Sequence, residues 1–331
     1  MKQYCSVLLL YLIQFTLRAE INTTGIPEGA IGFVYFNQET YSQTLLGKLT
    51  ISTLNKKLEE SAGNKEILMS LKNIKEISLG IYTHLNTAEN PENPQFVSIF
   101  RGHFSKSKID KFFSDNQVAC QKIQDYSTWD VSKVETIPKN DSSSPKSKNQ
   151  VHLIAYSDDL LIICSPELAN SAIDAVNQKK NSYKLPTQFT EMLKYSPQNW
   201  LAFYGDSTMD PTRNKESGLQ YVHAYLGENN DLTQLRCFNQ FTDENKTKSA
   251  TLQLKTTLTF LSMALSSTPP SAKMSKESLQ AVIDLLNSVK ISSNQSLQTI
   301  SADYPSKRAA DAFEVALKQT TPTEKLANEK N

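Results

Sequence analysis

Residues 151–165 read VHLIAYSDDLLIICS, a pattern typical of an antiparallel sheet. Two apolar, strand-forming runs, 151–156 and 160–165, flank a short polar segment. Such runs separated by a turn predict an antiparallel hairpin. The polar segment contains Asp158 and Asp159, which we interpret as turn residues rather than as a pair of catalytic acids, because aspartate is common in turns.

A second hairpin is predicted upstream of the first. Residues 75–86 alternate between apolar and polar side chains, and after a turn rich in Asn and Pro a further strand is expected at 95–104. Each hairpin is followed by a helix start, at Ser105 and at Ser165-Pro166. Strand pairs followed by helices predict an α+β fold rather than a regular β-α alternation.

The second half of the chain resembles the first. Residues 32–37 (GFVYFN) correspond to 201–206 (LAFYGD), and 81–85 (IYTHL) correspond to 222–226 (VHAYL) with the apolar side kept. We therefore expect two related α+β repeats, each an antiparallel sheet with helices packed on one face. Their boundaries are placed at 20–196 and 197–319, followed by a disordered tail at 320–331.

The N-terminal residues have the pattern of a signal peptide. Lys2 precedes an apolar run from Val7 to Phe15, and Ala19 supplies a small residue before Glu20. A run of about nine residues is too short to span a bilayer, which needs about 20. We expect residues 1–19 to be removed, leaving an exported, soluble protein, periplasmic or secreted, with no integral membrane segment.

The mature chain is close to neutral. Removing residues 1–19 takes away Lys2 and Arg18, so 35 basic residues become 33 against 34 acidic residues, a net charge of −1. A nucleic-acid-binding protein carries a strongly basic patch, so this balance argues against a nucleic-acid partner. The few glycines, 10 in 331 residues, do not form a dinucleotide fingerprint or a P-loop. We expect no cofactor.

Three cysteines remain after removal of the leader: Cys120, Cys164 and Cys237. Cys164 and Cys237 fall in strand-like apolar runs, where cysteine most often acts as a small buried apolar residue. We expect three free thiols. The sequence has no CxxC pair and no His/Cys cluster with ligand spacing, so no metal site is predicted.

Residues 104–113 (FSKSKIDKFF) and 160–176 (LLIICSPELANSAIDAV), together with the leader and the duplicated pattern, carry a resemblance. The chain resembles exported bacterial α+β repeat proteins of a domain-of-unknown-function class. The resemblance implies a secreted or periplasmic α+β protein, and it implies no functional residue.

One set of polar and aromatic residues is a candidate binding surface. Strand alternation is expected to bring these residues to the sheet face opposite the apolar side chains: Tyr82, His84, Arg101, His103, His223 and Tyr225. Tyrosine and arginine combine flat contact area with hydrogen bonding, as a glycan, peptide or protein partner requires. The alternative interpretation is a solvated sheet face without a ligand.

No catalytic residue is predicted. The sequence lacks the G-x-S-x-G and H-E-x-x-H motifs, although triads whose members meet only in space leave no local pattern. We therefore expect a non-catalytic binding or structural module. Two alternatives stay open: a periplasmic carrier of an apolar ligand, lined by the Leu-rich helix at 243–266, and a hydrolase without a recognisable motif.

Overall fold

The computed structural model describes residues 21–60, 73–82, 95–133, 150–187, 189–190, 199–209, 217–267 and 276–311. The predicted signal peptide, the predicted junction at 195–197 and the predicted tail at 320–331 lie outside the described residues.

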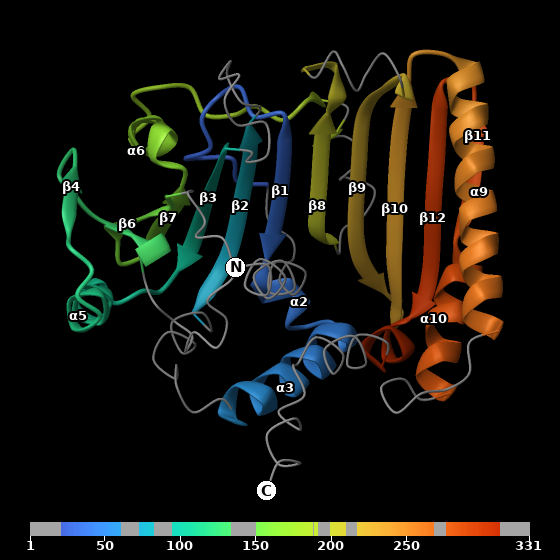
Figure 1. Cartoon of the computed structure of the whole chain (residues 1–331), viewed down its shortest axis with the longest axis horizontal. Coiled ribbons are helices and arrows are strands. Elements are labelled where there is room, and N and C mark those ends of the chain that lie inside the picture. The colour runs from blue at the N-terminus through green and yellow to red at the C-terminus, as the bar shows by residue number, and fades with distance from the viewer. Residues whose placement is uncertain are drawn as a thin grey trace, which may run out of the picture.

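The strands of the described residues form one antiparallel sheet of twelve, in the order β11-β12-β10-β9-β8-β1-β2-β3-β7-β6-β5-β4 (Figure 1). Their bounds are β1 Gly32–Asn37, β2 Ile74–Tyr82, β3 Gln95–Gly102, β4 Gln121–Ile123, β5 Tyr126–Asp130, β6 His152–Ser157, β7 Leu160–Cys164, β8 Asn199–Asp206, β9 Leu219–Asn229, β10 Leu232–Phe241, β11 Lys290–Asn294 and β12 Leu297–Pro305. The hairpin predicted from 151–165 is present as β6 and β7. β4 and β11, which are short, were not expected from the sequence.

The helices connect these strands. Their bounds are α2 Gln38–Tyr41, α3 Leu45–Glu60, α5 Lys106–Asp115, α6 Ala169–Val176, α9 Glu244–Ser267 and α10 Lys276–Ser288, with single 3₁₀ turns η1 Val131–Lys133, η2 Pro166–Leu168 and η3 Ser207–Met209. The chain is therefore an α+β protein, as the sequence predicts. Among the described residues, no helix combines the length and the apolar character that crossing a membrane requires.

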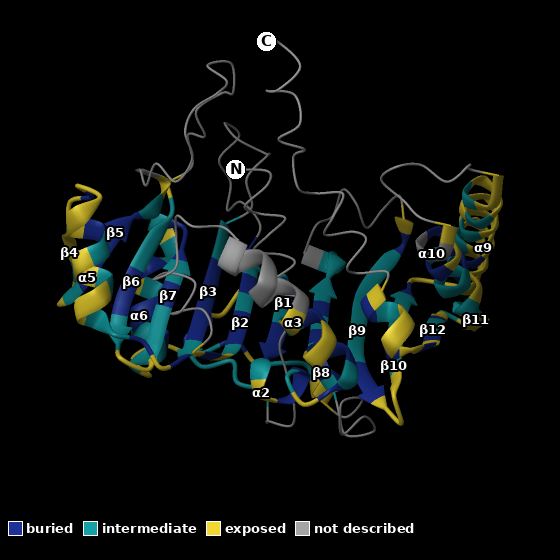
Figure 2. Ribbon diagram, turned by 90° about the horizontal axis from the view of Figure 1, so that it is seen from below, coloured by how far each residue is buried: buried dark blue, intermediate teal, exposed yellow. Residues whose placement is uncertain are grey.

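Central strand β1 joins the two halves of the chain. Phe33 pairs with Gly80 of β2 on one side and with Tyr204 of β8 on the other. The strands of both predicted repeats therefore belong to one continuous sheet, which curves in Figure 2. The correspondence between the repeats stays a prediction.

Helices pack on both faces of the sheet, which differs from the one-sided arrangement expected. Alternation along β1 sends Phe33 and Phe36 to opposite faces, named here the Phe33 face and the Phe36 face. Phe33 shares a buried cluster with Ile173 of α6, whereas Phe36 shares one with Phe100, against which Ile109 of α5 packs. Strands such as β7 (LLIIC) are apolar on both sides, so each face needs its own cover.

An irregular segment crosses the Phe33 face beside α6. We name residues 22–27 the N-terminal strap. The hydroxyl of Ser78 donates to the carbonyl of Asn22 at 2.7 Å, and the amide of Tyr183 donates to the carbonyl of Ile26 at 2.7 Å. Ile26 is fully buried. Gly25 has φ of +90°, and a Cβ there would meet Val176 at 2.7 Å, so the strap requires glycine at this position.

The three cysteines of the described chain are free thiols, as the sequence predicts: Cys164 is buried, Cys237 half-buried and Cys120 exposed.

Candidate functional site

Aromatic and polar side chains gather on the Phe33 face where β8, β9 and β10 run together. His223 lies opposite Tyr204 of β8 and opposite Phe238 of β10, and Tyr225 lies opposite Arg236. Directly opposed residues of antiparallel strands share a face. We name this surface the aromatic face and define it by six residues: Tyr204, Tyr221, His223, Tyr225, Arg236 and Phe238.

The rings of the aromatic face contact one another. His223 lies 5.3 Å from Tyr204 and 5.6 Å from Phe189, measured between ring centroids, and Tyr225 lies 6.5 Å from Phe238. Such spacings are favourable for aromatic pairs. Tyr204 is buried, whereas Tyr221, Tyr225 and Phe238 are half-buried. The surface therefore offers flat rings that are already held in place.

Arg236 is fixed by three hydrogen bonds. Its Nη1 donates to the carbonyls of Leu235 at 2.8 Å and Ala302 at 3.1 Å, and its Nη2 donates to Oδ1 of Asp303 at 2.7 Å. A guanidinium held this way loses little conformational freedom when a ligand binds. Its positive charge is also balanced locally by Asp303.

Burial lowers the pKa of His223 below its usual value of 6.5. Desolvation disfavours the charged imidazolium, so His223 is neutral at neutral pH. A neutral imidazole offers one donor and one acceptor. The aromatic face therefore presents aromatic rings and a neutral imidazole, and the positive charge of its Arg236 is balanced by Asp303.

Two of the predicted site residues share the Phe33 face but lie under the N-terminal strap. Tyr82 is 6 % exposed, and its hydroxyl donates to the carbonyl of Pro27 at 2.8 Å. Arg101 donates to Oγ of Ser78 at 3.2 Å and to the carbonyl of Thr24. The structure thus gives Tyr82 and Arg101 a role in holding the strap, because the face on which they lie is covered rather than solvated.

The other predicted residues are separated from these two. His84 lies outside the described residues. His103 follows the end of β3, is exposed, and its Nδ1 lies 3.2 Å from Oδ1 of Asp159. Of the six predicted residues, the aromatic face brings together His223 and Tyr225.

Five residues of this region were not predicted from the sequence: Phe189 and four members of the aromatic face, Tyr204, Tyr221, Arg236 and Phe238. Arg236 and Phe238 alternate along β10 with Leu235 and Cys237, so the period of a strand could have placed them on the polar side. Phe189 comes from a segment without strand periodicity, and only the three-dimensional structure places it beside His223.

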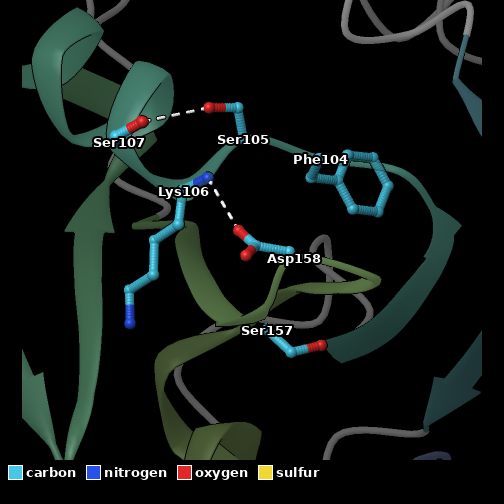
Figure 3. Close-up of a pocket in the computed structure, with 6 residues that line it drawn as sticks. All are labelled: Phe104, Ser105, Lys106, Ser107, Ser157 and Asp158. Atoms are coloured by element: carbon cyan, nitrogen blue, oxygen red, sulfur yellow. Dashed lines mark hydrogen bonds between the residues drawn. The ribbon is translucent and has the colours of Figure 1, made fainter.

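A shallow pocket of about 580 Å³ lies at the start of α5 (Figure 3). Its lining residues are Phe104, Ser105, Lys106, Ser107, Ser157 and Asp158. Oδ1 of Asp158 accepts a hydrogen bond from the amide of Lys106 at 3.1 Å, so a carboxylate of the protein already occupies the start of the helix. This arrangement opposes the binding of an anion there. Within the described ranges, no three His, Cys, Asp or Glu side chains are grouped as a metal site requires.

On the Phe36 face, two adjacent rows of side chains run across the strands, and neither row contains an acidic or a basic residue. The cross-strand register gives one row as Ser98, Leu79, Val34, Phe203, Ala224, Cys237 and Ile300, and the other as Phe96, Ile81, Gly32, Gly205, Val222, Asn239 and Gln298. We name them the uncharged rows. Near the centre of the sheet Val34, Phe203 and Val222 are only half-buried. Partly exposed apolar side chains side by side are compatible with an apolar ligand.

Comparison with known proteins shows a similarity of fold alone. No protein-family model and no curated protein matches the chain. Solved structures of TP0453 are similar in fold: crystal form I has 10 % identity and a TM-score of 0.46 over 89 % of this chain and 98 % of that one. Crystal form III has 11 % identity and a TM-score of 0.49 over 90 % and 99 %. The resemblance to exported proteins of a domain-of-unknown-function class stays a prediction.

Proposed function

We propose that this chain is an exported, non-catalytic binding protein, and that its partner lies on the aromatic face. The observation that carries the proposal is the half-buried cluster of Tyr221, His223, Tyr225 and Phe238 beside the immobilised Arg236. Tyrosine and arginine are enriched where proteins bind partners, and rigid side chains lose little entropy on binding. The export part of the proposal rests on the pattern of residues 1–19.

The surroundings of His223 support binding rather than catalysis. Its ring contacts are with Phe189, Tyr204 and Tyr221. A general base works within hydrogen-bond reach of the group that it deprotonates and is commonly oriented by a carboxylate. The proposal therefore assigns to His223 a hydrogen-bonding and packing role.

The test is a comparison of immobilised wild-type protein with a variant that lacks two half-buried rings of the aromatic face. Both are incubated with arrays of oligosaccharides and of peptides, and retained ligands are measured by surface plasmon resonance. Tyr225→Ser with Phe238→Ser is expected to weaken a retained ligand by about tenfold or more, because such rings are frequent binding hot spots.

The matched control is Leu232→Ser at the start of β10, which also removes an exposed apolar side chain, 36 % exposed, but outside the aromatic face. The control should bind as wild type. Retention of no ligand, or equal affinity of the double variant, would exclude the aromatic face as the binding surface.

A second candidate function, carriage of an apolar ligand, is favoured by the uncharged rows. Native mass spectrometry of protein purified from its own host distinguishes the two. A co-purifying apolar molecule that is lost in Phe203→Asp but kept in Tyr225→Ser with Phe238→Ser would assign the ligand to the Phe36 face.

A further inference from the structure

Helix α9 carries apolar side chains on two sides. One side faces the sheet, where Thr247 and Thr251 are buried and Thr251 accepts a hydrogen bond from Nε2 of Gln298 at 3.0 Å. On the other side Leu252, Phe260 and Met263 are 68 %, 66 % and 61 % exposed. Large apolar side chains this exposed, gathered on one helix, indicate an interaction surface.

The exposed side chains follow a regular line. Leu252, Thr256, Thr259 and Met263 are separated by four, three and four residues, which places them on one stripe of an α-helix. Phe260 lies next to this stripe. We name Leu252, Thr256, Thr259, Phe260 and Met263 the outer stripe.

Charge along α9 is strongly uneven. Its first half contains three lysines, Lys246, Lys248 and Lys255, and one acid, Glu244, which gives a net charge of +2, whereas no residue from Thr256 to Ala272 is charged. The outer side of the second half of the helix is therefore uncharged and only weakly hydrated. It ends at Ser267, where the last carbonyls of a helix carry partial negative charge.

We propose that the outer stripe of α9 binds the outer stripe of a second copy of this chain, with the two helices antiparallel about a two-fold axis. The spacing is symmetric about the midpoint between Thr257 and Leu258. Leu252 then lies level with Met263 of the second copy, and Thr256 lies level with Thr259. A two-fold interface requires one surface that complements itself, and the outer stripe meets that condition.

The uneven charge favours the antiparallel direction and this occupant. The same symmetry places the first turns of α9, where Lys246 and Lys248 outnumber Glu244, level with the last turn of the second copy's helix. A net positive segment therefore lies beside the negative end of the partner helix. A parallel pair would instead bring the lysine-rich halves together. The short threonine side chains at the centre allow the helix axes to approach closely.

The position of α9 leaves the aromatic face free. α9 flanks edge strand β11 at one end of the sheet, as Figure 1 shows, and it packs on the Phe36 side through Gln298. Two copies would therefore meet end to end, while the aromatic face of each stays accessible. The inference is independent of the proposed binding function.

Cysteine cross-linking tests the geometry. In a Cys120→Ser background, Leu252→Cys with Met263→Cys is expected to form a covalent dimer at least about tenfold faster than the control Gln253→Cys with Ala264→Cys. The control pair has the same separation along the helix and is also exposed, but it lies about 100° around the helix from the outer stripe. Equal rates for the two pairs would overturn the proposal.

Sedimentation velocity of the otherwise unmodified protein tests the association itself. A dimer that becomes a monomer in Leu252→Ser with Phe260→Ser and Met263→Ser, while circular dichroism keeps the wild-type melting curve, supports the proposal. A monomer up to about 100 μM overturns it, since stable interfaces associate well below that concentration. A monomer that binds phosphatidylglycerol vesicles through the outer stripe would assign the stripe to lipid and likewise overturn it.

Discussion

Glu228 joins two segments that are 183 residues apart in the sequence. It lies at the end of β9, is 7 % exposed, and accepts hydrogen bonds from the first amides of α3: Oε1 from Leu45 at 2.6 Å and Oε2 from Leu46 at 3.1 Å. These amides have no partner within their own helix, and a carboxylate there also interacts favourably with the helix dipole.

We expect Glu228→Gln to reduce the free energy of unfolding by about 1–2 kcal/mol, because the charge is lost and one amide loses its partner. Urea denaturation measures the change. Glu244→Gln serves as the control, since Glu244 is exposed and pairs with Lys248 one turn along α9, a contact worth about 0.3–0.5 kcal/mol. Equal losses in the two variants would contradict the capping role.

Arg101 ties the N-terminal strap to the sheet. It contacts Ser78, the carbonyl of Thr24 and, at 3.9 Å, Oε2 of Glu76. Arg101→Met keeps the aliphatic volume but removes these contacts, with an expected loss of about 2–3 kcal/mol. Hydrogen exchange should accelerate in residues 22–27 and stay unchanged in the β9–β10 hairpin. Unchanged exchange in the strap would show that Arg101 does not hold it.

His223 makes stability depend on pH. Its pKa is lowered in the folded protein by burial, so below pH 6.5 the unfolded chain binds a proton that the folded chain resists. Stability is therefore complete above that value and decreases as the pH falls toward the native pKa. Urea denaturation at about pH 7.5 and about pH 5 should give a smaller difference for His223→Phe than for wild type. A difference for His223→Phe equal to or larger than that for wild type would refute this assignment.

At the scale of elements, several hairpins turn through residues other than glycine. Asn230 and Asp231 connect β9 to β10 with φ of +50° and +59°. Two successive positive φ values in a two-residue turn match the right-handed twist of the strands, and glycine adopts them without strain. Gln124 and Gln295, with φ of +51° and +50°, occupy similar positions beside β4 and β11.

Asp231→Gly is expected to stabilise the protein by about 0.5–1 kcal/mol, because it relieves a left-handed conformation. Asp231→Val should destabilise it, since a β-branched side chain is poorly tolerated at positive φ. Thermal melting followed by circular dichroism orders the three proteins. A melting temperature of the glycine variant below that of wild type would argue against turn strain.

The elements also show how far the sequence could predict the fold. Period-two alternation over 75–86 correctly indicated β2, because a strand leaves that pattern wherever its faces differ in burial, and the apolar runs on either side of a turn correctly indicated β6 and β7. β4 and β11 are too short to show a period. The cover over Tyr82 and Arg101 was not predictable from alternation, because it comes from the strap, which is distant in sequence and has no period of its own.

At the scale of the whole molecule, the β1–β8 pairing makes the two halves one folding unit. The buried cluster on the Phe33 face contains Phe33 and Ile99 from the first half and Ala202 and Tyr204 from the second. We expect a single calorimetric transition in which the van't Hoff and calorimetric enthalpies agree. Val34→Pro should lower that transition as a whole, because β1 pairs on both sides. Two transitions that respond separately to mutation in each half would disprove the expectation.

The candidate site could be predicted from the sequence only in part, because alternation shows the side of a strand but not what covers that side. His223 and Tyr225 could be placed on the polar side of β9 from alternation alone. Whether that side is covered depends on which distant segments pack there, and the sequence gives no local sign of it. The strap covers β2 and β3, whereas β9 stays half-buried. Tyr82 and Arg101 are therefore covered, and His223 and Tyr225 are partly accessible, although strand alternation placed all four on the polar side of the sheet.

The two ends of the sheet limit how the protein can polymerise. Among the described residues the sheet ends at β4 on one side and at β11 on the other, and the end strands of a sheet can recruit further strands into fibrils. Here β4 has three residues and β11 has five, and each carries a lysine, Lys122 or Lys290. Short, charged end strands are poor templates for fibril growth, so a sheet of this width can stay dispersed at high concentration.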